Sequence, residues 1–185
     1  MHSIALIVMG LFHFLSELLI GRARRAKDSS KDAGSLRILW LTIQISLMVG
    51  IAAAFAVPAA RIHPARVIFP IGLGFYACGL ALRWWAIIYL GRFFTVNVTV
   101  ATDHRVVDSG PYRYIRHPSY TGGLLAFLGL SLCLSNAFSI LIIMIPIFLA
   151  FRKRMDIEES VLATALEPSC RDYVRRTKRL IPFVY

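Results

Sequence analysis

Two polar segments of the chain contain the side chains that could do chemistry. The first, residues 97–122, interleaves tyrosine, arginine and histidine with glycine and proline before an apolar run. Pro118 suits the first turn of a helix, where backbone N–H groups can face an anion. In the second segment, residues 152–179, Arg154 and Glu158 are spaced to share a helix face. Because arginine can hold a carboxylate and glutamate can accept from an amine or a ribose hydroxyl, the segments favour a cationic cofactor beside an anionic substrate.

The elements that position these segments must lie in a membrane. Of 185 residues, 57% are hydrophobic and 17% are charged, and the mean hydropathy is +0.65. One soluble core cannot use that much apolar surface. In hydrocarbon each apolar stretch must satisfy its own backbone polar groups, so we predict an all-α, polytopic membrane protein.

The apolar runs predict about five transmembrane helices. Ser135 and Asn136 favour a turn near the middle of the longest run, which predicts that the last two helices form a tight hairpin. A cytoplasmic C-terminal helical segment follows. We expect one integrated domain, with membrane helices and a short basic loop in residues 1–91 and a catalytic half in residues 92–185. The four apolar runs are residues 4–20, 36–57, 67–90 and 120–151.

The basic residues predict the orientation of the chain. They concentrate after the first and third helices and in the tail from Arg152 onward, which places the N-terminus outside and the active site and C-terminus in the cytoplasm. This arrangement fits the inner membrane of a prokaryote or the endoplasmic reticulum of a eukaryote.

The net charge of +11 does not indicate nucleic acid, because the basic residues are spread over juxtamembrane loops without a recognisable binding motif. Membrane lipids with anionic headgroups are the expected partners. Three cysteines indicate neither a disulfide framework nor a metal site.

The polar segments carry a resemblance to a known family. The run GPYRYIRHPSYTG at residues 110–122, followed later by Glu158 and Glu159, resembles the signature of the isoprenylcysteine carboxyl methyltransferases, which are integral membrane enzymes that use S-adenosylmethionine. The approach segment at residues 103–110 and the closing run at residues 173–182 extend the resemblance, which begins at about Arg92.

This resemblance implies roles for individual residues. Glu158 would contact the cofactor, and Arg154 would bind the substrate carboxylate. A family glutamine that touches the cofactor falls on Asn97, which has a shorter side chain. The other residues implied to bind S-adenosylmethionine are His104, Arg105, Val106, Val107, Tyr112, His117, Pro118, Ser119 and Tyr120.

The implied reaction is methyl transfer to a carboxylate of an amphiphilic or prenylated substrate that enters from the bilayer. An ionised carboxylate needs no general base, so catalysis would rest on proximity and a dry pocket. The alternatives are a phospholipid or thiol methyltransferase, an NADPH-dependent reductase of the sterol type, and a membrane scaffold without enzymatic activity.

Several polar residues also have a purely structural interpretation. Arg154 and Glu158 taken alone could be an ordinary ion pair at a surface. His13, Glu17 and Arg83 lie inside apolar spans, where they could line a substrate or proton path or form a structural pair between helices. The cluster of Gly72, Gly74 and Gly79 favours close helix packing over a nucleotide-binding loop.

Overall fold

The computed structural model describes residues 2–23, 34–95, 106–166, 169–182 and 184–185. Within these ranges the fold is all-helical, and two isolated bridges take the place of any β-sheet. The prediction of an all-α chain is therefore confirmed. The helices are α1 (His2–Ala23), α2 (Ser35–Ala56), α3 (Ala65–Leu90), α4 (Pro118–Cys133), α5 (Ala137–Ala165) and α6 (Ser169–Arg176), and the short 3₁₀ turns are η2 (Pro58–Ala60), η3 (Gly91–Phe93) and η4 (Gly110–Arg113).

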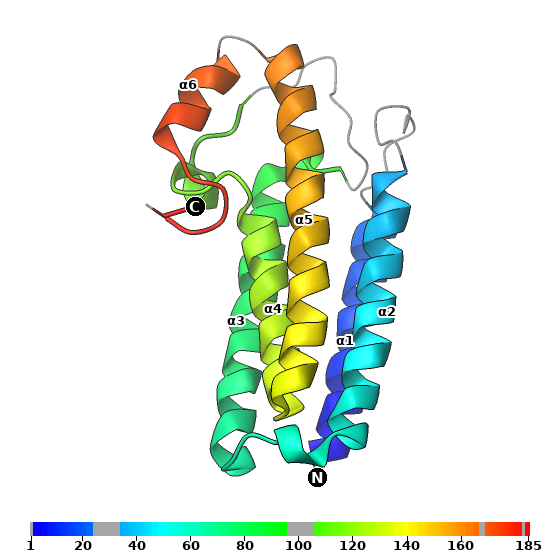
Figure 1. Ribbon diagram of the computed structural model, residues 1–185. Coiled ribbons are helices and arrows are strands. Elements are labelled where there is room, and N and C mark those ends of the chain that lie inside the picture. Colours follow the sequence, from blue (N-terminus) through cyan, green and yellow to red (C-terminus); the bar gives the residue numbers. More distant parts are fainter. Residues whose placement is uncertain (1, 24–33, 96–105, 167–168, 183) are drawn as a thin grey trace.

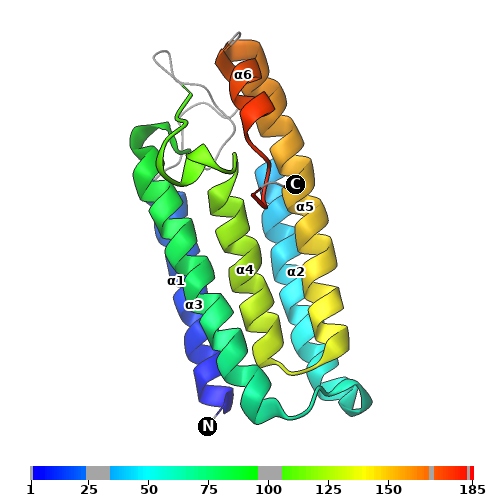
Figure 2. The ribbon, with the colours of Figure 1, turned by 90° about the vertical axis from the view of Figure 1, so that its left-hand side faces the viewer.

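The five long helices form one bundle with α4 at its centre. Figures 1 and 2 show α4 between α3 and α5, and they show α2 beside α5. The N-terminus lies at one end of the bundle, and α6, η4 and the C-terminus lie together at the other end (Figure 1). The described parts of the two polar segments, residues 106–122 and the C-terminal end of α5 with α6, therefore share one end of the bundle.

The first three long helices have the length and composition of membrane spans. These spans are Ile4–Arg22, Ser35–Ala56 and Ala65–Phe93. Their outer faces are apolar, with large exposed side chains such as Ile4, Met48 and Phe55. Apolar surface of this extent requires lipid rather than water. The protein is therefore membrane-embedded.

The chain reverses between α4 and α5 at residues 134–136, where the sequence predicts a turn. Ser135 has a positive φ of 50°, and the Asn136 side chain accepts a hydrogen bond from the backbone N–H of Ser139 at 3.1 Å. Asn136 also donates to the carbonyl of Val57 at 2.9 Å, which ties this turn to the end of α2. The Asn136 side chain therefore both caps the start of α5 and holds the turn against a distant segment of the chain.

The helix α5 is longer than the apolar run from which it was predicted. It has 29 residues and continues past Phe151 through the basic run 152–154. No glycine or proline occurs between Ile147 and Glu167, and the arginine, lysine, methionine and glutamate residues there are good helix formers. The same helix therefore continues from the apolar run into the polar end of the bundle.

Glycines allow α3 and α4 to approach until their backbones touch. A Cβ atom on Gly79 would lie 2.6 Å from the carbonyl oxygen of Gly122, and one on Gly72 would lie 2.7 Å from that of Gly129. Gly74 has nothing within 4 Å of its Cβ position. The packing interpretation is confirmed for Gly72 and Gly79, because only small residues permit such contacts.

We expect Gly79→Ala to lower the free energy of unfolding by roughly 1–3 kcal/mol, because the added methyl group meets backbone that cannot move aside. Gly74→Ala makes the same chemical change on the same helix in open space and should leave stability unchanged or slightly higher. Thermal unfolding in detergent micelles measures both variants. Equal midpoints would contradict the close packing of α3 on α4.

Candidate active site

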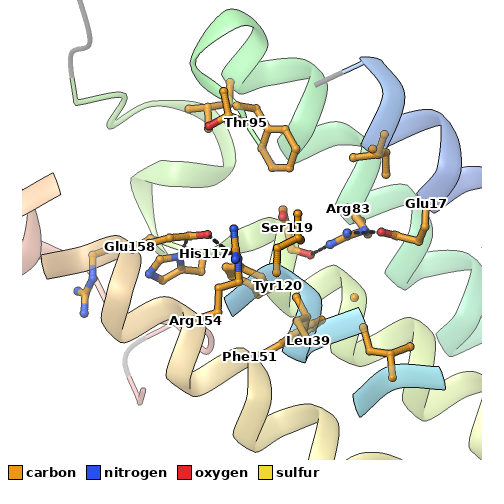
Figure 3. Close-up of a pocket in the computed structure, with 18 of the residues that line it drawn as sticks. Glu17, Leu39, Arg83, Thr95, His117, Ser119, Tyr120, Phe151, Arg154 and Glu158 are labelled. Carbon is orange, nitrogen blue, oxygen red and sulfur yellow. Dashed lines mark hydrogen bonds and ion pairs between the residues drawn. The ribbon is translucent and has the colours of Figure 1, made fainter. Parts of the chain in front are cut away.

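A cavity of about 290 Å³ connects the apolar interior of the bundle with its polar end. Its membrane-side walls are apolar and include Leu39, Ile43 and Phe127. Its other end is lined by charged and aromatic groups, including Arg154 and Glu158 (Figure 3). One continuous space can therefore contain an apolar chain and a charged group together.

The structure brings most of the predicted site residues to this cavity. Those that line it are Val106, Val107, Tyr112, His117, Ser119, Tyr120, Arg154 and Glu158.

Pro118 does not line the cavity. It is fully buried in the first turn of α4, where its fixed φ suits the start of the helix. Asn97, His104 and Arg105 lie outside the described residues.

Glu158 on α5 is the carboxylate at the centre of the polar end. Its Oε1 accepts a hydrogen bond from the Tyr120 hydroxyl at 2.5 Å and lies 3.4 Å from Nε of Arg154. Its Oε2 is 3.8 Å from Nδ1 of His117. Figure 3 shows these side chains converging from α4 and α5.

Arg154 does not behave as an ordinary surface partner of Glu158. Its side chain is 2% exposed, and Nη1 donates to the Ser35 hydroxyl of α2 at 2.6 Å. The interpretation of Arg154 and Glu158 as a plain exposed pair is therefore wrong. The reason is that α2 packs along α5 and covers the arginine, which the i, i+4 spacing alone cannot reveal.

Glu159 is a second carboxylate, to which the sequence reasoning assigned no role. It accepts hydrogen bonds from Nε of Arg116 at 3.0 Å and from Nη2 of Arg179 at 2.7 Å, and it lies 3.0 Å from Nε2 of His117. Burial alone would raise the pKa of Glu159, but the bonds to His117 and Arg116 outweigh it and lower that pKa to about 2. The sequence shows many arginines in both polar segments, but it does not show which carboxylate they surround.

The closing run of the chain holds the start of α4 in place. The backbone N–H of Arg116 donates to the carbonyl of Lys178 at 2.7 Å, and that of His117 donates to the carbonyl of Arg179 at 3.0 Å. The Thr121 hydroxyl donates to the carbonyl of Leu180 at 2.8 Å. These bonds fix the second half of the motif at residues 110–122 against the closing run.

The Tyr112 hydroxyl donates to the carbonyl of Ala86 at 3.2 Å, while its own carbonyl accepts from the Tyr173 hydroxyl at 2.8 Å. Burial raises the pKa of both phenols. They therefore act as neutral groups that join η4 to α3 and α6.

The intramembrane charges form a pair that also borders the cavity. Arg83 of α3 donates to Glu17 of α1 from Nε at 2.6 Å and from Nη2 at 2.8 Å. Its Nη1 donates to the carbonyl of Ser119 at 3.1 Å (Figure 3). The pair joins α1 to α3, as the structural interpretation expects. It also lines the cavity, as a residue pair on a substrate or proton path would.

His13 also lines the cavity, and among the described residues neither of its ring nitrogens has a hydrogen-bond partner.

This arrangement can bind two opposite charges at once. A carboxylate, an imidazole and a phenol can hold a cationic amine, and a buried guanidinium can hold a carboxylate. Among the described residues no group of three His, Cys, Asp or Glu side chains could hold a metal ion.

Comparison with known proteins agrees with this chemistry. The sequence model of the isoprenylcysteine carboxyl methyltransferase family matches residues 72–164. Protein-S-isoprenylcysteine O-methyltransferase B of Arabidopsis thaliana is 31% identical over 146 residues, which is 78% of this chain and 73% of the relative. The chain belongs to the isoprenylcysteine carboxyl methyltransferase family. The family predicted from the sequence is thus confirmed.

Other members extend the comparison. The protein-S-isoprenylcysteine O-methyltransferase of Schizosaccharomyces pombe is 32% identical over 60% of this chain, and the match covers 48% of that relative. A solved structure of a eukaryotic intramembrane Ras methyltransferase, an isoprenylcysteine carboxyl methyltransferase, superposes with a TM-score of 0.68 at 28% identity. It covers 96% of this chain and 64% of that one. The chain therefore spans about half to three quarters of the length of these family members.

The network around Glu159 predicts a loss of stability in acid. The pKa of Glu159 falls from its ordinary value of 4.5 to about 2 on folding. Its contribution to the free energy of unfolding is therefore fully present above pH 4.5 and disappears as the pH falls through about 2. The difference in thermal midpoint between the wild type and Glu159→Gln should shrink over this window. A constant difference from pH 5 to pH 2 would contradict the account of this carboxylate.

Proposed function

We propose that this chain is an S-adenosylmethionine-dependent methyltransferase that esterifies a carboxylate on a lipid-like substrate of the prenylcysteine type. The observation that carries the proposal is the single cavity, which joins a charged end at Arg154 and Glu158 to an apolar end between membrane helices. The names of the related proteins, which are protein-S-isoprenylcysteine O-methyltransferases, support this substrate class.

The groups at the polar end suit a cofactor that carries an amino acid and a positive charge. Glu158 and His117 would hold its amine, while Tyr112, Val106 and Val107 would provide an aromatic and apolar surface nearby. Bound S-adenosylmethionine would supply an electrophilic methyl group on a sulfonium. Asn97, His104 and Arg105 stay predicted cofactor contacts on the strength of the motif.

Arg154 would bind and orient the substrate carboxylate. The carboxylate is ionised at neutral pH, so no residue has to remove a proton from it. Arg154 also contacts Glu158 and Ser35, which divides its charge among several acceptors. A carboxylate held by a shared guanidinium is oriented without losing all of its nucleophilicity. Catalysis then rests on proximity and on exclusion of water.

The apolar half of the cavity would take the substrate's hydrocarbon tail from the bilayer. Leu39 and Ile43 on α2 and Phe127 on α4 provide this surface. Because a tail in the bilayer is already out of water, its transfer into the cavity gains little free energy from the hydrophobic effect. The apolar end would therefore admit and align the tail, while the polar end would bind and orient the carboxylate.

We further propose that all five long helices cross the membrane. The 16 residues of α4 span roughly 24 Å, so this helix requires a locally thinner bilayer. The N-terminus would lie outside, and the active site and C-terminus would face the cytoplasm, where basic loops meet anionic lipids. The halves 1–91 and 92–185 would act as one integrated domain, because helices from both line the cavity.

Calorimetry on the detergent-purified protein tests cofactor choice. We expect saturable binding of S-adenosylmethionine and none of NADPH. Glu158→Gln should weaken binding by roughly tenfold or more, which corresponds to about 1.4 kcal/mol. Arg154→Gln should retain cofactor binding, because its proposed ligand is the substrate.

Lys153→Gln is the matched control for Arg154→Gln, because it removes one positive charge from the adjacent, exposed position on α5. It should bind S-adenosylmethionine as the wild type does. If the protein bound NADPH and not S-adenosylmethionine, the reductase hypothesis would replace the methyltransferase hypothesis. Absence of binding of either compound to folded protein would favour a scaffold.

A further inference from the structure

His117 lies between two carboxylates that follow one another on α5. Its Nε2 is 3.0 Å from Oε1 of Glu159, whereas its Nδ1 is 3.8 Å from Oε2 of Glu158. The first distance is that of a hydrogen bond, and the second is too long for one. The two nitrogens of one ring therefore have different environments.

Glu159 is itself held by fixed cations from two other segments. Arg116 donates to its Oε1 at 3.0 Å, and Arg179 donates to its Oε2 from Nε at 3.1 Å and from Nη2 at 2.7 Å. Such charge-assisted bonds keep the carboxylate ionised and oriented. An ionised carboxylate can only accept hydrogen bonds, so its bond to His117 requires the proton on Nε2.

The backbone around His117 is fixed by the same closing segment that supplies Arg179. The His117 N–H donates to the carbonyl of Arg179 at 3.0 Å, and the ring rests 5.6 Å from that of Tyr120, measured between ring centroids. Hydrogen bonds therefore fix both the backbone and Nε2 of His117, and the Tyr120 ring packs beside the imidazole. The remaining atom, Nδ1, is on the side of Glu158, and both residues line the cavity.

We propose that Glu159, held by Arg179, is a positioning residue that keeps His117 in the tautomer with its proton on Nε2. Nδ1 of His117 and the carboxylate of Glu158 then form a pair of acceptors for one ammonium group. Two acceptors 3.8 Å apart cannot bond to each other, but a cationic amine between them can donate to both. We assign this amine to the amino-acid end of the methyl donor, an assignment that rests on the proposed function.

The tautomer can be measured without any ligand. Nitrogen chemical shifts of ¹⁵N-labelled histidine in micelles at neutral pH distinguish the two neutral tautomers and the imidazolium, and His117→Asn assigns the signal. We expect the Nε2-protonated neutral form. A proton on Nδ1 alone, or an imidazolium shared between Glu158 and Glu159, would overturn the proposal.

Two variants test whether Glu159 acts through His117. Glu159→Leu removes the acceptor for Nε2 and should shift the tautomer signal, whereas Asp156→Asn should not. Asp156 is the matched control, because it also bonds Arg179, at 2.7 Å, and carries the same charge. An unchanged histidine signal in Glu159→Leu would show that Glu159 does not set the tautomer of His117, and it would overturn the positioning role.

The ammonium assignment is tested with S-adenosylhomocysteine and its deaminated analogue. Wild type and Asp156→Asn should bind the amine-bearing compound roughly tenfold more tightly, and this ratio should be smaller in Glu159→Leu, which keeps Glu158 but loses the acceptor that holds His117. Equal ratios in all three proteins would overturn the assignment. If neither compound bound the wild type, the proposed function would fail, and the tautomer would still decide the positioning role of Glu159.

Discussion

The close contact of α3 with α4 is the constraint on which the rest of the structure depends. Gly79 and Gly122 let the two backbones touch, which brings Arg83 against the carbonyl of Ser119. That carbonyl belongs to the first turn of α4, two residues after His117. A larger residue at the contact would displace this turn from the carboxylates of α5. Packing between α3 and α4 therefore sets the geometry of the polar end of the cavity.

Charge pairing is the second requirement, because each charged group near the membrane must be compensated where it is buried. Glu17 pairs with Arg83, and Glu158 contacts Arg154. Glu159 forms ion pairs with both Arg116 and Arg179. These pairs connect α1 to α3 and the C-terminal run to α5. The same contacts that neutralise charge therefore also assemble the polar end of the cavity.

Much of this arrangement could be predicted from the sequence, because apolar runs and turn residues act locally. The reversal near Ser135 and Asn136 and the glycine packing are examples, and the motif at residues 110–122 identified the family. The burial of Arg154 under α2 and the role of Glu159 could not be predicted, because each depends on segments that meet only in three dimensions. Ser35 and Arg179 are far from them in sequence, and no periodicity relates these positions.

The most direct test of the central claim is product analysis with S-adenosylmethionine labelled in its methyl group. The purified chain in liposomes would be given an N-acetyl-S-farnesylcysteine acceptor and, separately, the same compound with its carboxylate converted to an amide. The account predicts that only the acceptor with a free carboxylate becomes labelled. The label should be a methyl ester, from which alkali releases labelled methanol. Label in the amide, alkali-stable label, or no transfer by folded, cofactor-binding protein would contradict it.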